Sequence, residues 1–225
     1  MFHSGHRKRM RARLSSDGLD SFTDEQVLEY ILTLAIPRRD VRPIAAALLE
    51  IYGTLARVLE APPEELIKVE GIGSHTAALL TLTPLLQRRY ALSRNPNNPI
   101  LTTTEEICAY LQPYFSGCNE ECVYLLCMDA KCKVLDCRKV STGGMNSVGF
   151  NLRRVVEIVL QQRATTVVLA HNHPWGLALP SREDEIVTKE LQNALKVVNV
   201  HLADHIIVCE EECVSMAASG LLQRY

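Results

Sequence analysis

The hydrophobic positions in the first hundred residues recur every three or four places, a spacing that predicts amphipathic helices. Leu28, Ile31 and Leu32 follow this spacing, and Thr23 or Asp24 stands where such a helix would be capped. Prolines and glycines interrupt the pattern, so we expect several short helices rather than one long one. After the first, these helices are expected at about 43–52, at 54–59 and from 62 onward.

Beyond residue 100 the pattern is mixed, with helical stretches between short apolar runs that are typical of strands. Thr103 or Thr104 can cap a first helix, and the runs 123–128 and 133–138 predict a β-hairpin. A Gly-rich loop is expected at 141–147. Further helices are expected around 155–160 and at 182–197, and further strands at 167–170, 200–208 and 214–216. Helices that alternate with a mixed sheet predict an α/β fold for this part of the chain.

A polar, proline-rich segment separates the two patterns and is unlike either of them. It reads Arg-Asn-Pro-Asn-Asn-Pro at 94–99, a composition that is typical of an interdomain linker. We therefore expect a helical domain over residues 1–94, a linker over 95–100 and an α/β domain over 101–225.

Length and charge limit the class of protein. The 225 residues carry a formal net charge of -2, which suits two modest domains with enough core to fold. No apolar run reaches membrane-spanning length, and Met1 is followed by charged residues rather than by a signal peptide. We expect a soluble, cytoplasmic protein with no membrane partner.

The cysteines are unevenly distributed, and the stretch 118–137 contains five of the eight. No Cys-x-x-Cys pair occurs, so the sequence does not indicate a zinc ribbon or a cluster. Thiols in the cytosol are kept reduced, and buried thiols often act as small hydrophobic side chains. We interpret the group as packing residues, with exposed thiols such as Cys118 open to oxidation.

One stretch of the second half carries a candidate metal site, which consists of His171, His173, Ser181 and Asp184. The apolar run 165–169 predicts a buried strand, and residues two apart on a strand share a face. His171 and His173 can therefore aim two imidazoles at one point. Pro180 precedes a helical pattern, which places Asp184 in the first turn of the next helix. Two imidazole nitrogens and one carboxylate oxygen are three ligands for a catalytic zinc ion that keeps a fourth position open.

The same residues have a simpler interpretation. Ser181, followed three residues later by an acid, is a capping-box pattern that needs no metal. A pair of histidines at a strand end also occurs as hydrogen-bonded polar structure. Each feature alone favours this simpler interpretation, but their combination at this spacing favours a metal site.

The segment His171-Asn172-His173-Pro174, with Ser181 and Asp184, resembles the zinc motif of the JAMM (JAB/MPN+) metalloproteins. Its flanking sequence resembles the RadC-like (UPF0758) branch, and this resemblance covers nearly the whole chain. It implies a cytidine-deaminase-like JAMM/MPN domain with a mixed sheet and flanking helices. It further implies one Zn²⁺ per chain, bound by His171, His173 and Asp184, and a Ser181 that steadies the tetrahedral intermediate.

The resemblance also implies a general base at the lip of an upstream strand, where Glu121 stands and Glu120 is adjacent. Zinc lowers the pKa of a bound water towards neutrality, and a nearby carboxylate can take its proton and pass it to the leaving group. JAMM enzymes characteristically cleave amide bonds, so the resemblance implies a metallopeptidase or isopeptidase acting on a peptide or protein. Without the downstream motif, the two acids would indicate only a solvated strand start.

The helical half contains the motif Gly71-Ile72-Gly73 between an apolar helix end and an Ala-rich stretch. It resembles a helix-hairpin-helix element, whose backbone amides can bind a phosphate. Glu70 beside the turn and the mild charge of this half favour a compact interhelix turn instead. The basic segment 5–13 can contact phosphates but is more typical of a solvated chain end. A DNA-associated accessory protein, as the DNA-repair label of the RadC-like family suggests, is therefore the alternative to a hydrolase.

Three other residues have two interpretations each. Trp175 replaces the small residue usual at its position in the family, and serves either as a substrate platform or in packing. His205 either orients a metal ligand or is a hydrogen-bonded core histidine. His201, four residues earlier, suggests a second metal only weakly. The sequence does not predict an oligomeric state.

Overall fold

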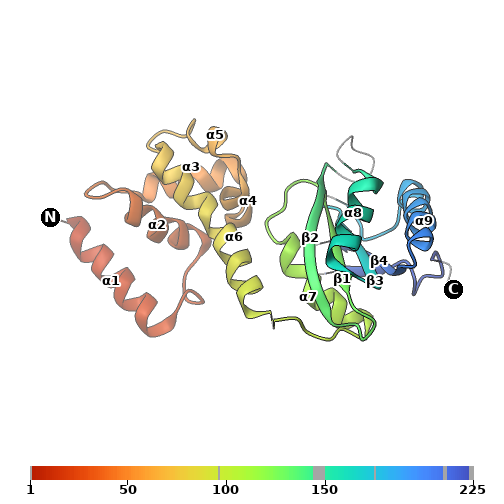
Figure 1. Cartoon of the computed structure of the whole chain (residues 1–225). Helices are drawn as coiled ribbons and strands as arrows, with labels where there is room; N and C mark the ends of the chain where they lie inside the picture. The colour runs from red at the N-terminus through yellow and green to blue at the C-terminus, as the bar shows by residue number, and fades with distance from the viewer. Residues whose placement is uncertain (1, 96, 144–149, 175, 210–211, 223–225) are drawn as a thin grey trace. The chain divides into compact units, whose positions relative to one another are not determined.

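The computed structural model describes residues 2–95, 97–143, 150–174, 176–209 and 212–222. The chain forms two compact units, Met1–Gln87 and Arg88–Tyr225, and each has a hydrophobic interior of its own (Figure 1). The division falls within the long helix α6 (Ser74–Arg94), a few residues before the polar segment that resembles a linker.

Helices make up the regular structure in the described part of the first unit. They are α1 (Phe2–Asp17), α2 (Asp24–Ala35), α3 (Arg42–Tyr52), α4 (Leu55–Glu60), α5 (Pro63–Leu66) and most of α6. Their apolar faces meet in a core that includes Leu28, Leu32, Leu48 and Leu80. The helical spacing of the sequence is thus confirmed by α2, α3 and α4.

Polar residues begin the helices where the sequence predicts them. Thr23 caps α2, and its hydroxyl oxygen accepts a hydrogen bond from the backbone of Gln26, whose side chain bonds back to Thr23. Thr103 and Glu106 form the same reciprocal pair at the start of α7 (Thr104–Phe115). A cap of this kind satisfies backbone N–H groups that have no partner within the helix.

The basic segment 5–13, which we expected to be a solvated chain end, lies within helix α1. Its side chains bond back onto the unit. Nε2 of His6 lies 2.6 Å from Oε1 of Glu29, and Arg7 donates to the main-chain carbonyl of Arg39 at 2.7 Å. The helix is held largely by such polar contacts rather than by an apolar stripe, which is why hydrophobic spacing does not predict it.

The turn between α5 and α6 depends on Gly71. Its φ of 92° lies in the left-handed region, and a Cβ atom there would come within 2.8 Å of Cδ1 of Ile44. Both the backbone conformation and the packing therefore require glycine. The expected tight turn between two helices is present, and the helix before it, α5, has only four residues.

The second unit is a mixed α/β fold built on a five-stranded sheet with the order β2-β1-β3-β4-β5. Its strands are β1 (Cys122–Met128), β2 (Val134–Thr142), β3 (Thr166–Asn172), β4 (His201–Cys209) and β5 (Glu212–Ser215). Only β3 and β4 pair in parallel, and the other neighbours are antiparallel. The predicted hairpin is confirmed by β1 and β2. Ser141 and Thr142, expected in a loop, belong to β2, and residues 144–149 of that loop lie outside the described residues.

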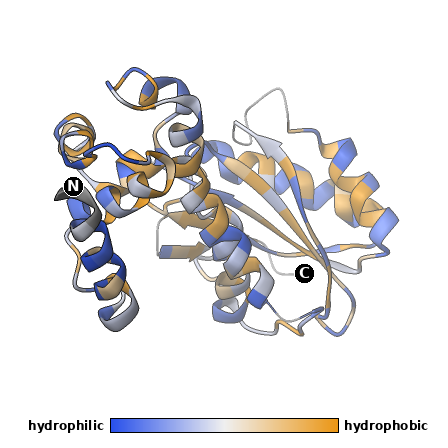
Figure 2. Ribbon diagram, turned by 90° about the vertical axis from the view of Figure 1, so that its left-hand side faces the viewer, coloured by the Kyte–Doolittle hydropathy of each residue, from blue (hydrophilic) through white to orange (hydrophobic). Residues whose placement is uncertain are grey.

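Helices cover both faces of this sheet (Figure 1). They are α7 (Thr104–Phe115), α8 (Leu152–Gln162) and α9 (Arg182–Val197). Leu111 of α7 packs with Leu126 on one face, while Val159 of α8 and Leu191 of α9 pack with Leu125 on the other. Alternate residues of β1 therefore enter two different cores. In Figure 2 hydrophobic residues are frequent along the strands of the sheet. None of the helices within the described ranges combines the length and the apolar character needed to cross a bilayer.

The cysteines of the second unit contribute to packing, in agreement with the sequence. Cys122 and Cys127 are buried in β1, and no disulfide joins the cysteines that the structure describes. Burial raises the pKa of Cys127 to about 12, so this thiol stays protonated and is a poor nucleophile.

Three strand ends meet at one edge of the sheet. The parallel strands β3 and β4 both end there, with Asn172 paired to Val208. The antiparallel strand β1 begins there, with Val123 paired to His171. Open α/β sheets commonly place their functional sites at the carboxyl ends of parallel strands. The fold thus brings the segments around residues 121 and 171 together.

The core between the sheet and helices α8 and α9 generates a prediction about stability. Leu169 is fully buried in that core, whereas Leu160 on α8 is 54% exposed. Leu169→Ala is expected to lower the free energy of unfolding by about 2–5 kcal/mol, because it leaves a cavity. Leu160→Ala is the matched control and should change it by less than about 0.5 kcal/mol. Urea denaturation followed by circular dichroism measures both, and equal effects would contradict the assignment of Leu169 to the core.

Candidate metal centre

Three consecutive pieces of structure position the motif. Strand β3 ends with His171 and Asn172, the loop 173–181 leaves the sheet, and helix α9 begins at Arg182. Because β3 lies between β1 and β4, the sheet holds His171 from both sides. Asp184 lies in the first turn of α9, which packs over the same face.

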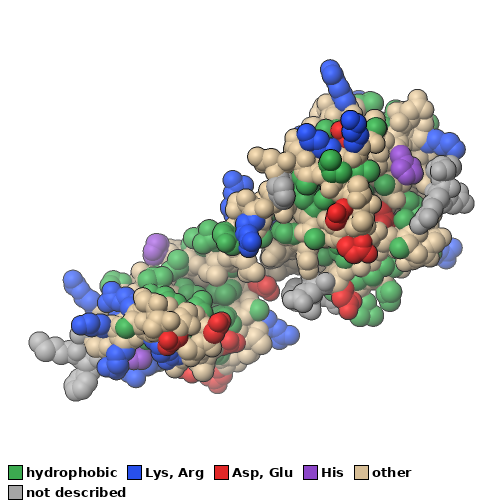
Figure 3. Space-filling model, turned by 90° about the horizontal axis from the view of Figure 1, so that it is seen from below, with side chains coloured by type: hydrophobic (Ala, Val, Ile, Leu, Met, Phe, Trp, Pro, Cys, Tyr) green, Lys and Arg blue, Asp and Glu red, His purple; other side chains and the backbone are tan. Residues whose placement is uncertain are grey.

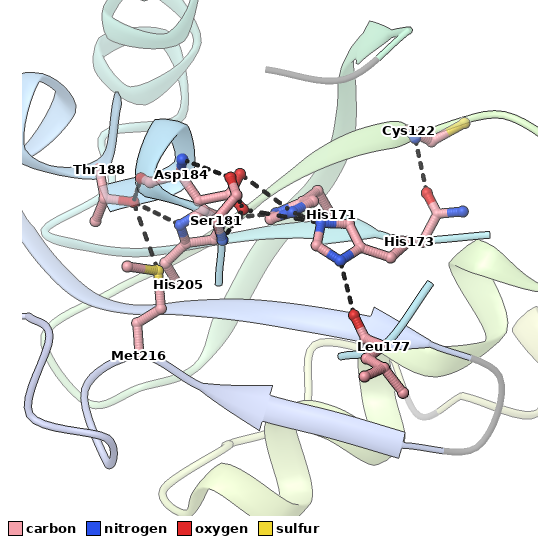
Figure 4. A network of polar contacts seen from close by, with 10 residues as sticks. Cys122, His171, His173, Leu177, Ser181, Asp184, Thr188, His205 and Met216 are labelled. Atoms are coloured by element: carbon pink, nitrogen blue, oxygen red, sulfur yellow. Dashed lines mark hydrogen bonds and ion pairs between the residues drawn. The ribbon is translucent and has the colours of Figure 1, made fainter. Parts of the chain in front are cut away.

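Three side chains of the motif converge on one point (Figure 4). The Nε2 atoms of His171 and His173 lie 2.9 Å apart. Oδ1 of Asp184 lies 3.3 Å from Nε2 of His171, and Oδ2 lies 3.8 Å from Nε2 of His173. The potential ligand atoms of these residues all lie within 4.8 Å of one another, and no other trio of His, Cys, Asp or Glu does so in the described ranges. The structure thus brings together the three residues for which the sequence predicts a shared metal.

The ring of His173 is held from its far side. Its Nδ1 lies 2.9 Å from the main-chain carbonyl oxygen of Leu177. Because a carbonyl oxygen can only accept a hydrogen bond, Nδ1 carries a hydrogen. In the neutral form that binds metals, the lone pair of the ring is then on Nε2, which faces the group.

The carboxylate of Asp184 is fixed by the start of α9. The backbone N–H and the hydroxyl of Ser181 donate to Oδ2 of Asp184 at 2.8 and 2.7 Å, and the Asp184 N–H donates to the Ser181 hydroxyl at 3.1 Å. This capping box confirms the simpler interpretation of Ser181, and it coexists with the convergence on the histidines. Burial raises the pKa of Asp184, but the hydrogen bonds from Ser181 act in the opposite direction, and the pKa lies below its usual value, which favours the ionised carboxylate.

His171 is almost fully buried and is supported from behind by a second histidine. Its Nδ1 lies 2.8 Å from Nε2 of His205 on β4, whose own Nδ1 lies 2.6 Å from Oγ1 of Thr188 on α9. Complete burial lowers the pKa of His205 well below its usual value, so the ring is neutral. His201 is exposed at the opposite end of β4 and does not join the group.

Glu121 lies immediately before β1 and is exposed. Val123 pairs with His171, so continuing the alternation two residues back places Glu121 opposite His173, on the face that carries both histidines. By the same count Glu120 falls on the other face. The sheet register therefore favours Glu121 over Glu120, and its carboxylate lies outside the converging trio.

Asn172, between the two histidines, has a positioning role that the sequence pattern does not predict. Its Oδ1 accepts from the N–H of Cys122 at 2.7 Å, and its Nδ2 donates to the carbonyls of Glu120 and Cys118 at 3.2 and 3.5 Å. These bonds hold the segment that carries Glu121 against the end of β3. An amide side chain at the end of a predicted buried strand is the sequence feature that could indicate this role, because buried polar groups require hydrogen-bond partners.

The surface near the group is acidic and apolar. Four exposed carboxylates lie on the adjoining segments: Glu120, Glu121, Glu183 and Glu185. Leu177 and Leu179 of the loop are 71% and 61% exposed, and the nearest exposed cation on α9 is Arg182. Trp175, for which the sequence suggests a role in substrate binding or packing, lies outside the described residues. Such a rim suits a neutral or cationic ligand with apolar groups better than a polyanion.

The donor set fits a zinc ion. Catalytic zinc sites use three protein ligands drawn from imidazole nitrogens and carboxylate oxygens, and leave one position for water or substrate. The side chains of His171 and Asp184 are only 1% and 8% exposed, whereas that of His173 is 18% exposed. The group is therefore accessible from the side of His173.

The contacts of Asn172 generate a second prediction. Asn172→Ala removes three hydrogen bonds and leaves a buried N–H of Cys122 without its acceptor. The expected loss in free energy of unfolding is about 1–3 kcal/mol, measured by urea denaturation. Asn193→Ala, which makes the same change at an exposed position of α9, is the matched control and should change the free energy of unfolding by less than about 0.5 kcal/mol. An Asn172→Ala variant as stable as the wild type would contradict the positioning role.

Comparisons with known proteins agree with this architecture. Residues 101–221 match the family described as the RadC-like JAB domain. The chain is 30% identical over 213 residues to a UPF0758 protein of Rhodobacter capsulatus, an alignment that covers 95% of this chain and 100% of that protein. It is 32% identical over 215 residues to a UPF0758 protein of Pseudoalteromonas translucida, with 96% of each chain covered. The family match spans more than half of the residues, and the two relatives align along nearly the whole length of the chain. The chain therefore belongs to the RadC-like JAB family.

Proposed function

We propose that the chain is a zinc-dependent hydrolase that cleaves an amide bond in a peptide or protein. The convergence of His171, His173 and Asp184 at an accessible point carries this proposal. Membership of the RadC-like JAB family supports a metal-dependent hydrolase fold, while the names of the relatives state no activity. We propose one zinc ion per chain.

The proposed roles follow from the chemistry of each side chain. Bound zinc would supply a Lewis acid that polarises a carbonyl and lowers the pKa of water. Glu121 is the proposed general base, which accepts a proton and later returns it to the leaving amine. Ser181 is the proposed donor to the oxyanion. Its hydroxyl hydrogen is bonded to Asp184, so this role requires the hydroxyl to turn while the Asp184 N–H still holds its oxygen.

The rim favours a peptide over a nucleic acid as the substrate. Glu120, Glu121 and the acids at the start of α9 would repel phosphates, while a basic or neutral peptide meets no such barrier. Leu177, whose main-chain carbonyl contacts His173, has an exposed side chain that offers an apolar surface for a substrate side chain. A peptide or isopeptide bond is therefore the proposed target.

DNA binding by a helix-hairpin-helix element is the weaker proposal for the first unit. Its basic side chains are partly engaged within the unit, since His6 bonds to Glu29, and Arg7 and Arg13 bond to neighbouring main-chain and side-chain oxygens. Glu70 is exposed beside the turn of Gly71. On the face of the helical unit seen in Figure 3, blue side chains lie among red and green ones. Phosphate binding needs a concentrated basic surface, so the hydrolase is the preferred function.

Metal content tests the ligand assignment. Purified wild type is expected to contain about one zinc per chain by elemental analysis. His173→Ala is expected to lose this zinc, whereas Glu121→Ala should retain it, because a general base is not a ligand. Absence of zinc from carefully prepared wild type would refute the hydrolase. Loss of zinc from Glu121→Ala would instead show that the base is wrongly assigned.

Amide cleavage tests the reaction. The zinc-loaded wild type is incubated with a proteome-derived peptide library and with Gly–Lys isopeptides, and new amines are detected by mass spectrometry. Glu121→Ala should reduce cleavage by about 100-fold to 10,000-fold, which is the usual contribution of a general base. Glu120→Ala is the matched control and should leave most of the activity. Cleavage that survives Glu121→Ala but not Glu120→Ala would reverse the assignment of the base.

A further inference from the structure

A chain of polar groups lies buried behind His171, outside the converging trio (Figure 4). It runs from Nδ1 of His171 to His205 at 2.8 Å, from His205 to Oγ1 of Thr188 at 2.6 Å, and from Thr188 to the main-chain carbonyl of Asp184 at 2.5 Å. Thr188 and His205 are both buried, at 2% and 0% exposure, so water does not compete for these contacts. The positions of the hydrogens decide which atom donates and which accepts at each step of this chain of polar groups.

The carbonyl of Asp184 determines the first hydrogen. Two oxygens 2.5 Å apart require a hydrogen between them, and a carbonyl oxygen has none, so the hydroxyl of Thr188 donates. A hydroxyl has only one hydrogen, so Thr188 must accept from Nδ1 of His205. The sulfur of Met216, 3.7 Å from the hydroxyl, is a weaker acceptor that does not compete.

The remaining hydrogens follow in order. A neutral imidazole carries one N–H, and in His205 it is on Nδ1, so Nε2 of His205 holds a lone pair. That lone pair faces Nδ1 of His171, which must therefore be the N–H donor. In the neutral ring that binds a metal, the lone pair of His171 is then on Nε2, the atom that faces Nε2 of His173 and Asp184.

We propose that His205 and Thr188 are positioning residues that fix the one tautomer of His171 able to bind zinc. This inference rests on the proposed function and extends it to residues that do not touch the metal. Metal-bound histidines usually donate their second N–H to a carboxylate or a carbonyl, and here the acceptor is another histidine. Its own orientation is set by the backbone of Asp184, so one ligand sets the tautomer of another through Thr188.

Two variants, Thr188→Val and Thr188→Ser, distinguish the hydrogen bonding of Thr188 from its packing. Valine keeps the shape and removes the hydroxyl, so His205 loses the acceptor for its Nδ1 hydrogen. Serine removes a methyl group and keeps the hydroxyl. Thr188→Val is expected to weaken zinc affinity by about 10- to 100-fold, as is usual when the partner of a metal ligand is lost, and Thr188→Ser should remain close to wild type.

Zinc affinity is measured on the full chain by competition with a chromophoric chelator, using zinc alone as the probe. Thr76→Val, which makes the same change at a buried position of the first unit, is the control and should bind zinc as wild type does. A Thr188→Val variant that binds zinc normally overturns the inference. So does a Thr188→Ser variant that binds as weakly as Thr188→Val, because that result points to packing.

The tautomers are also measured without any metal. Long-range ¹H–¹⁵N spectra of the zinc-free chain distinguish the two ring nitrogens, and His205→Gln assigns the signals. The expected result is an Nδ1 hydrogen on both His171 and His205 in wild type, with loss of that pattern in Thr188→Val. An Nε2 hydrogen on His171 overturns the inference even if zinc binds. A wild type with the expected tautomers and no affinity for zinc would instead refute the proposed function.

Discussion

The close approach of a buried carboxylate to two imidazole nitrogens is the interaction on which the site of the second unit depends. Polar groups withdrawn from water are costly unless each has a partner, and His171 and Asp184 are both buried. Their partners come from different elements: His171 contacts His205 of β4 and Asp184 of α9, and Asp184 also accepts from Ser181 of the loop after β3. The sheet order, with β3 beside the parallel strand β4, and the packing of α9 on that face are what bring these partners within reach.

The two imidazoles are oriented by different contacts, and the difference follows the burial of each ring. His173 is partly exposed and uses the carbonyl of Leu177, four residues along the same loop. His171 is buried and depends on groups from β4 and α9, which are far from it in the sequence. The exposed ligand is therefore held by local structure, and the buried one by the tertiary fold.

Much of the fold and of the site follows from the sequence, and the exceptions have physical reasons. Hydrophobic spacing predicts α2 and β3, and the His-x-His pattern with Asp184 predicts the converging trio, because spacing along one strand and one helix start is local information. It does not predict α1, whose contacts are largely polar, or the continuation of β2 through Thr142. Nor does the sequence predict the hydrogen-bonding roles of Asn172 and Thr188, since their partners Glu120 and His205 lie 52 and 17 residues away in sequence. Long-range hydrogen bonds leave no period in a single chain.

The capping box at the start of α9 has a consequence for how sequences of this kind diverge. Oδ2 of Asp184 accepts the hydrogen bonds that begin the helix, and Oδ1 faces His171, so the same side chain serves folding and chemistry. A descendant that lost its reaction would still be under selection to keep this aspartate for the helix. Retention of Ser181 and Asp184 alone is thus weak evidence for a working site. The two histidines, which cap nothing, are the residues whose loss would record the loss of chemistry.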